Sequence, residues 1–130
     1  MRTVKDVEAY LGRLSREFTA VEDHPGMFLV QSATNMPPMA VRVDPPLVVI
    51  RVHVCDVGKT NHAELFRRLL QLNAKELVHA SYGLDEQRVV LSAALELENL
   101  DFNEIEAALD EMDVALAQQV PELVKLAKSN

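Results

Sequence analysis

The triplet Gly58-Lys59-Thr60 is the part of the sequence that comes closest to a nucleotide-binding motif. It follows an apolar stretch and precedes a helical pattern, as a phosphate-binding loop would. Such a loop needs another glycine five residues before Gly58, because successive backbone amides must wrap the phosphates. His53 stands at that position, and Val54 and Val57 lie between the two. We therefore interpret the triplet as a turn that leads into a helix, and we expect no nucleotide cofactor.

His53 and Cys55 are a second candidate for chemistry, because two positions along a strand bring both side chains to one face. A structural zinc site needs four nitrogen or sulfur ligands, whereas the chain has one cysteine and its other histidines are scattered singly. A thiol nucleophile needs an orienting third group, and Asp56 is expected on the opposite face. We therefore expect no catalytic residue and no metal. A small enzyme or ligand sensor is an alternative that a deep polar pocket holding both side chains would support.

Carboxylates crowd the segment from Asp101 to Asp113, which is the first half of a predicted helix. Negative charge near a helix N-terminus is favoured by the helix dipole. Paired carboxylates can do acid–base chemistry, but carboxylates on an open helix face usually serve solubility. We interpret this cluster as a solvated face.

The charge balance excludes general binding to nucleic acid or to anionic lipid, both of which favour basic proteins. The chain has 20 acidic and 13 basic residues, with a formal net charge of −7. Its single cysteine cannot form an intrachain disulfide, its N-terminus carries charges where a signal peptide is apolar, and no apolar run is long enough to span a bilayer. With 48% hydrophobic residues, the expectation is one acidic cytoplasmic domain over residues 1–130.

Alternating apolar residues predict strands, of which the clearest runs from Leu47 to Cys55. Its valines and isoleucine at 48, 50, 52 and 54 are expected to face a core. The dipeptide Pro25-Gly26 predicts a type II turn, because glycine accepts the positive φ that the turn needs. Further strands are expected over Met27–Gln31, Met39–Val43, Leu77–Tyr82 and Arg88–Leu95, with a possible short partner over Phe18–Glu22.

Apolar residues at three- and four-residue spacing predict three helices. The first is expected to start after Thr3 and to run for about fifteen residues, to Phe18. The second is expected over Asn61–Asn73, with Asn61 as its N-cap and Asn73 as a left-handed C-terminal residue. The third is expected to start at Asp101, with Glu104 completing a capping box, and to kink or restart at Pro121. The order is helix, three or four strands, helix, two strands, helix, and the fold class is α+β.

The far face of the sheet is the most informative surface. The alternation places Arg42, Arg51, His53 and Arg88 there, beside the apolar Val49 and Val90. The first interpretation is a solvated face whose basic groups pair with glutamates across strands. The second is a surface for a partner or for self-association, because interfaces favour arginine mixed with apolar residues. The residues assigned to that surface are Val49, Arg51, His53, Arg88 and Val90.

Four segments then resemble the YbjN-like branch of the type III secretion chaperone-like proteins. They are Leu69-Leu70-Gln71-Leu72-Asn73-Ala74, His79-Ala80-Ser81-Tyr82-Gly83-Leu84-Asp85, Arg88-Val89-Val90-Leu91 and Glu98-Asn99-Leu100-Asp101. The resemblance covers roughly residues 26–116 and implies an αβββαββα layout, in which a twisted antiparallel sheet carries helices mainly on one face. The matching segments are structural, so no catalytic residue is carried over.

The resemblance implies a non-enzymatic protein. The secretion chaperones are small, acidic, cytoplasmic homodimers of bacteria that hold an extended segment of a partner protein, and YbjN-like proteins are linked to regulation of stress and motility. We therefore expect a chaperone-like, protein-binding homodimer. The alternatives are a regulatory module that forms one specific complex, or one that senses a small ligand. The homodimer is also expected because three helices can cover one sheet face but leave the other uncovered.

Overall fold

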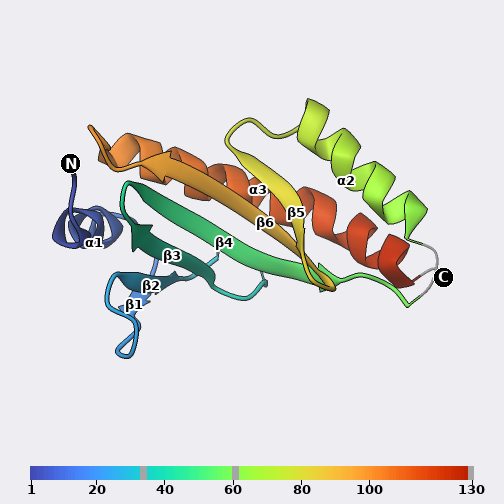
Figure 1. The fold of residues 1–130 in the computed structure, drawn as a ribbon, viewed down its shortest axis with the longest axis horizontal. Coiled ribbons are helices and arrows are strands. Elements are labelled where there is room, and N and C mark those ends of the chain that lie inside the picture. The colour runs from blue at the N-terminus through green and yellow to red at the C-terminus, as the bar shows by residue number, and fades with distance from the viewer. Residues whose placement is uncertain (33–34, 60–61, 129–130) are drawn as a thin grey trace.

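A sheet of six antiparallel strands with three helices makes up the part of the chain that the computed structural model describes, residues 1–32, 35–59 and 62–128. The α+β class is confirmed, with four strands between the first two helices (Figure 1). The elements are α1 (Val4–Gly12), β1 (Phe18–Ala20), β2 (Met27–Val30), β3 (Met39–Asp44), β4 (Leu47–Asp56), α2 (Ala63–Lys75), β5 (Ala80–Asp85), β6 (Arg88–Glu96) and α3 (Phe102–Lys128). None of these helices is long and apolar enough to cross a membrane.

The strands follow one another in the order β1-β2-β3-β4-β6-β5, so β1 and β5 are the two edges of the sheet. We call the side toward α3 the inner face and the opposite side the outer face. Figure 1 shows α3 running along the sheet across β6 and β4. The expected alternation of β4 is confirmed, since Val48 and Ile50 are fully buried and Val52 is 3% exposed. The inner face therefore carries the core.

The third helix begins as expected. Asp101 accepts a hydrogen bond from the backbone amide of Glu104, whose carboxylate accepts one from the amide of Asp101. Apolar residues along one side of α3 are fully buried against the sheet: Ile105, Leu109, Met112 and Leu116. The restart expected at Pro121 is wrong, because α3 continues through this residue to Lys128. The buried Val120 and Leu123 hold the helix to the core on both sides of the proline.

The first helix is shorter than expected. Thr3 caps it through the predicted capping box, but α1 ends at Gly12. Phe18, expected to continue the helical stripe, instead starts β1, where it pairs with Val30 and packs edge-on against Phe28. Glycine weakens a helix because it loses more backbone conformational entropy on folding than any other residue. The tertiary contacts of Phe18 then favour the strand. The possible short strand near residue 18 is thereby confirmed.

The boundaries of α2 and β5 also differ from expectation. The expected cap Asn61 lies outside the described residues. Asn73 does not end α2, which continues to Lys75. The side chain of Asn73 instead binds the backbone of Tyr82. The strand expected from Leu77 starts at Ala80 and continues to Asp85, so the hairpin to β6 turns through residues 86–87. Gly26 has φ +86° in the predicted type II turn, which is confirmed by the hydrogen bond from the amide of Met27 to the carbonyl of His24.

Candidate functional site

The outer face gathers the five residues assigned to a partner surface. In the strand register Val49 lies beside Ala94, Arg51 beside Ser92, and His53 beside Val90, while Arg88 lies between Asp56 and Asp85. Arg51, His53 and Arg88 are exposed and Val49 is half-buried. The sequence therefore predicted correctly that these residues share a face.

Val90 is not the exposed apolar residue that the alternation predicts, because only 7% of its surface is exposed. In the register it lies between His53 on β4 and Gly83 on β5. The guanidinium of Arg51 reaches diagonally across this row to the carboxylate of Asp85, at 3.4 Å. The stem of a long arginine side chain can cover apolar surface in this way. Val90 therefore has little surface left to offer a partner.

The basic groups of the outer face have carboxylate partners on neighbouring positions. Arg42 pairs with Asp44 at 3.5 Å, and the Nε2 of His53 lies 3.1 Å from Asp56. With Arg51 and Asp85, each of these three basic side chains has an aspartate partner, where glutamates were expected. Exposed pairs of this kind contribute between about 0 and 1 kcal/mol each. They therefore add little to the stability of the fold.

A shallow hollow of about 250 Å³ lies on the outer face between β2, β3 and β4. Its lining residues are Met27, Ala40, Arg42, Val49 and Arg51. The small side chain of Ala40 opens the hollow, because its larger neighbours on both strands rise around it. This hollow brings Val49 and Arg51 together and does not include His53, Arg88 or Val90.

Cys55 does not lie on the outer face with His53, so this expectation is wrong. The register of β4 against β6 shifts between the two residues, so His53 pairs with Val90 and Cys55 with the buried Val89. A β-bulge of this kind adds one residue and reverses the alternation beyond it. Cys55 packs against the core, and burial together with the nearby Asp56 raises the pKa of its thiol. His53 and Cys55 therefore point to opposite faces of β4 and do not form the pair that a shared polar pocket would need.

The edge strand β1 offers unpaired backbone on one side. The amide of Gln31 donates to the carbonyl of Glu17, and the amide of Val21 donates to the carbonyl of Met27, so residues 17, 19 and 21 turn toward β2. In an antiparallel pair the intervening residues turn the other way. The backbone groups of Phe18 and Ala20 therefore point away from the sheet.

Two adjacent hollows lie along this edge. The first, of about 350 Å³, is lined by Glu17, Phe18, Thr19, Leu29, Gln31, Met36 and Pro38. The second, of about 410 Å³, is lined by Ser15, Arg16, Glu17, Gln31 and Ser32. They share the lining residues Glu17 and Gln31, and we call the two hollows together the β1 groove. Its first half is largely apolar, and its Leu29 is 39% exposed.

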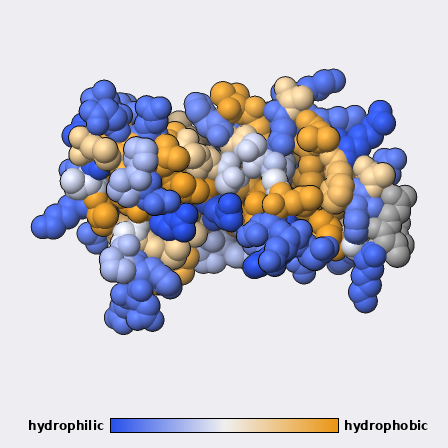
Figure 2. Space-filling view, viewed as in Figure 1, coloured by the Kyte–Doolittle hydropathy of each residue, from blue (hydrophilic) through white to orange (hydrophobic). Residues whose placement is uncertain are grey.

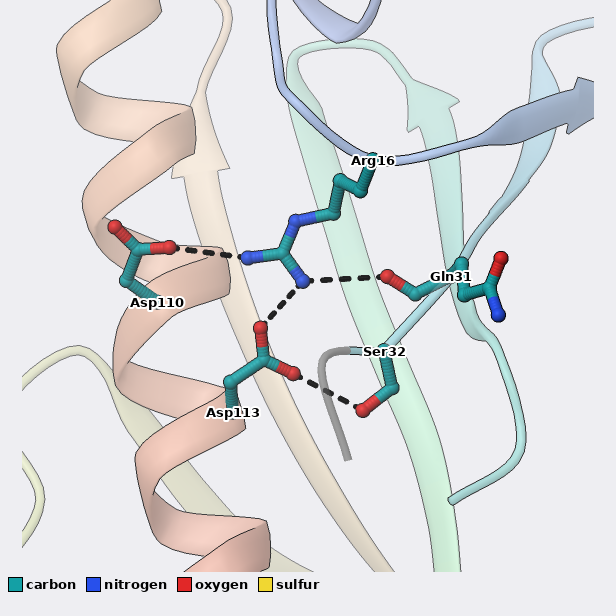
Figure 3. A network of polar contacts seen from close by, with 5 residues as sticks. All are labelled: Arg16, Gln31, Ser32, Asp110 and Asp113. Carbon is teal, nitrogen blue, oxygen red and sulfur yellow. Dashed lines mark hydrogen bonds and ion pairs between the residues drawn. The ribbon is translucent and has the colours of Figure 1, made fainter. Parts of the chain in front are cut away.

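A polar network closes the second half of the β1 groove against α3 (Figure 3). The guanidinium of Arg16 donates to Asp113, to Asp110 at 3.0 Å and to the carbonyl of Gln31 at 3.2 Å. The hydroxyl of Ser32 donates to the second oxygen of Asp113 at 3.0 Å. The side chains of Arg16 and Asp113 are 16% and 10% exposed, so this pair is largely withdrawn from water.

The burial of Asp113 corrects the interpretation of the acidic cluster as a solvated face. Asp113 follows the buried Leu109 by four positions and precedes the buried Leu116 by three, which places it on the core side of α3. That spacing was visible in the sequence and indicates a buried carboxylate that needs a partner. Arg16 carries no comparable signal, because nothing in its own neighbourhood shows that it would reach α3.

Glu111 is another acidic residue of the cluster with a structural role. Its carboxylate accepts hydrogen bonds from the consecutive backbone amides of Val78, His79 and Ala80, each at 3.0 Å, where the chain enters β5. Burial alone would raise the pKa of Glu111, but these hydrogen bonds and one from His79 lower it below its ordinary value of 4.5. The ionised carboxylate therefore fixes the start of the edge strand.

We expect Glu111→Gln to lower the free energy of unfolding by about 1–3 kcal/mol at neutral pH. Because the folded-state pKa is depressed, the carboxylate stabilises the fold above pH 4.5 and loses that contribution as the pH falls through the lower folded value. The difference between wild type and variant, measured by urea denaturation at pH 7 and pH 3, should therefore shrink in acid. A difference that is the same at both values would contradict this role.

The edge of β5 is also engaged by α2. The side-chain amide of Asn73 accepts a hydrogen bond from the amide of Tyr82 at 2.7 Å and donates one to its carbonyl at 3.1 Å. A side-chain amide carries the same donor and acceptor as a peptide group, so Asn73 takes the place of a neighbouring strand. On the inner side, the hydroxyl of Tyr82 donates to Gln119 of α3 at 2.6 Å. Residue types alone did not indicate either contact.

Exposed apolar residues elsewhere are scattered. Figure 2 shows apolar patches on the viewed side that are interrupted by hydrophilic residues. The most exposed large apolar side chains of the helices and strands, and of the turn before β5, are Leu70 (68%), Val78 (81%), Leu84 (50%) and Val114 (54%). Among the described residues, no cluster of histidine, cysteine and carboxylate side chains could hold a metal ion.

Comparison with known proteins gives one family and several solved structures that share this fold. A family model described as CesT_Tir_1 matches residues 1–129. No curated protein matches the chain. Among solved structures, a chain of the heterodimeric ExoU–SpcU complex of the Pseudomonas aeruginosa type III secretion system superimposes with a TM-score of 0.71 at 16% identity, covering 95% of this chain and 99% of that one.

Two further structures have the same fold. YbjN from E. coli superimposes with a TM-score of 0.68 at 14% identity, covering 90% of this chain and 93% of its own. A chain of the ExsC–ExsE complex superimposes with a TM-score of 0.65 at 17% identity, covering both chains completely. At these identities the similarity establishes the arrangement of helices and strands.

Proposed function

Because the chain belongs to the CesT_Tir_1 family, we propose that it is a non-enzymatic domain that holds an extended segment of a partner protein in the cytoplasm. The family membership confirms the resemblance found in the sequence. Two of the structures that share the fold are complexes with a second protein, ExoU–SpcU and ExsC–ExsE, which supports a protein partner here. The partner segment would be recognised by its backbone and by apolar side chains.

The observation that carries this proposal is the open edge of β1 beside an apolar hollow. Phe18 and Ala20 turn their backbone groups away from the sheet, as a strand does when another strand can be added. The hollow of about 350 Å³ next to them is lined by Phe18, Leu29, Met36 and Pro38 among others. An added strand would gain backbone hydrogen bonds at β1 and bury an alternate apolar side chain in the hollow.

We expect Ala20→Pro to abolish partner capture and Ala20→Val to preserve it. Proline removes the outward amide that an added strand needs, whereas valine keeps it and suits a strand. Ala20 is exposed and its amide does not turn toward β2, so both variants should keep the wild-type melting temperature within a few degrees. The test is affinity capture from the native cytoplasm, with the wild type and the two variants each used as bait, followed by mass spectrometry. Equal capture by all three would contradict strand addition at β1.

The same experiment separates a specific complex from a general one. A regulatory module would retain one protein in a fixed ratio, whereas a holder of unfolded segments would retain many. Gel filtration of the reconstituted complex gives that ratio. In both cases the proline variant should lose what the valine variant retains.

We further propose that the protein is a homodimer that uses the uncovered outer face. The support is the absence of any helix over this face in the described residues, together with the half-buried Val49 and the small Ala40 and Ala94 around it. Small side chains allow two sheets to approach closely. Of the five predicted residues, Val49 and Arg51 line the hollow of this face and would be nearest to its centre.

Light scattering at micromolar concentration should give twice the monomer mass of 14.5 kDa. Replacing both Arg51 and Arg88 by glutamate should weaken the dimer or the capture of the partner, because each would place a carboxylate next to existing aspartates. A monomer in the wild type would contradict the proposal. Loss of neither property in the double variant would make the outer face a solvated one.

A further inference from the structure

The polar network of Figure 3 joins the two ends of the β1–β2 hairpin to α3. Arg16 lies just before β1, and Ser32 lies just after β2. The hairpin register brings these two segments together, since the amide of Gln31 donates to the carbonyl of Glu17. Asp113 of α3 accepts from both Arg16 and Ser32, so one carboxylate holds both ends of the hairpin.

The Arg16–Asp113 pair carries a desolvation cost in free energy, which a role in stability alone does not explain well. Withdrawing an arginine and a carboxylate from water is expensive, and apolar residues of similar size often stabilise a fold as much or more. What a charged, multiply bonded pair supplies in addition is a defined direction for each hydrogen bond. Here the directions decide where the hairpin lies relative to the helix.

The network is also part of the β1 groove. Arg16 and Ser32 line its second hollow, which meets the first hollow at Glu17 and Gln31. A displacement of the hairpin along α3 would therefore change the shape of both hollows and the direction of the open edge. The printed partners of the network lie at the two ends of the hairpin and on α3, so the central strand β4 should not be affected.

We propose that Arg16, Asp113 and Ser32 are positioning residues of the β1 groove, which hold the open edge of β1 in the orientation that an added strand requires. The inference rests on the proposed function only in its second part. Its first part, that the network immobilises the β1–β2 hairpin, holds whether or not a partner exists. None of the three residues needs to touch the partner.

The test uses the double variant Arg16→Met/Asp113→Leu, which replaces the charged pair by apolar groups of similar size. Its melting temperature should stay within a few degrees of wild type. Amide hydrogen exchange, measured residue by residue, should accelerate at least tenfold at Val21 and Gln31 and remain unchanged at the central strand, for example at Ile50. The control is Arg68→Met/Glu122→Leu, which removes an exposed ion pair between α2 and α3 and should change neither region.

The second readout is partner binding. The partner used is the protein that the wild type captures from the cytoplasm and the Ala20→Pro variant does not. The apolar double variant should bind it at least tenfold more weakly, while the control variant binds it normally. Unchanged exchange in the hairpin, or unchanged binding, would overturn the positioning role. Failure to find such a protein would contradict the proposed function and leave the exchange result to decide the immobilisation. Should the double variant not fold, Asp113→Asn must show the same local acceleration for the proposal to stand.

Discussion

Val52→Asp is expected to unfold the protein, whereas Arg51→Ala should leave it folded with a melting temperature close to wild type. Val52 is 3% exposed and faces the core from β4, next to Leu91 of β6. A carboxylate at this position would lie within the hydrophobic core. An unpaired buried charge costs several kcal/mol, a large share of the roughly 5–15 kcal/mol that stabilises a domain.

Arg51 is the matched control because it is the neighbouring residue on the same strand with the opposite orientation. Its removal loses one exposed ion pair with Asp85, which amounts to about 1 kcal/mol or less. Circular dichroism melts of the two variants check the prediction. Similar melting temperatures would mean that the faces of β4 are assigned wrongly.

Arg16→Met is expected to lower the free energy of unfolding by about 3–5 kcal/mol, because it removes one partner of a largely buried ion pair. Ser32 still donates to Asp113, but a hydroxyl cannot neutralise a carboxylate that is 10% exposed. Adding Asp113→Leu to this variant should restore most of the loss. The two substitutions must therefore be far from additive.

A double-mutant cycle by urea denaturation measures this coupling. The same cycle on Arg68 and Glu122, whose side chains are 36% and 48% exposed, should give less than about 1 kcal/mol. Additive effects for Arg16 and Asp113 would show that the pair does not act as a unit. The difference between the two cycles measures the effect of burial on an ion pair.

Alternation and spacing predicted the central part of the fold because they report burial directly. The inner face of β4 follows from β-branched residues two apart, and the buried side of α3 follows from apolar residues three and four apart. The capping boxes of Thr3 and Asp101 were predicted for a different reason, which is that their partners lie within one helical turn. Such local patterns need no knowledge of the rest of the chain.

The features that sequence reasoning missed depend on residues far apart in the chain. The bulge that turns Cys55 inward is set by the pairing of β4 with β6, and the ion pair of Arg51 with Asp85 joins β4 to β5 across β6. Asn73 and Glu111 have ordinary helix positions in the sequence, yet they bind the backbone of β5. The open edge of β1 likewise became visible only with the strand order, which the sequence pattern did not contain.

The two edges of the sheet are unlike, and this limits the size of any assembly that grows by adding strands. At β5, the amides of Ala80 and Tyr82 are already bound by Glu111 and Asn73, while β1 has no such partner among the described residues. A subunit with two receptive ends can polymerise into a fibre, because each addition creates a new end. An assembly of subunits with one receptive end stops growing after a single addition. Strand addition at β1 therefore leads to closed complexes of defined stoichiometry.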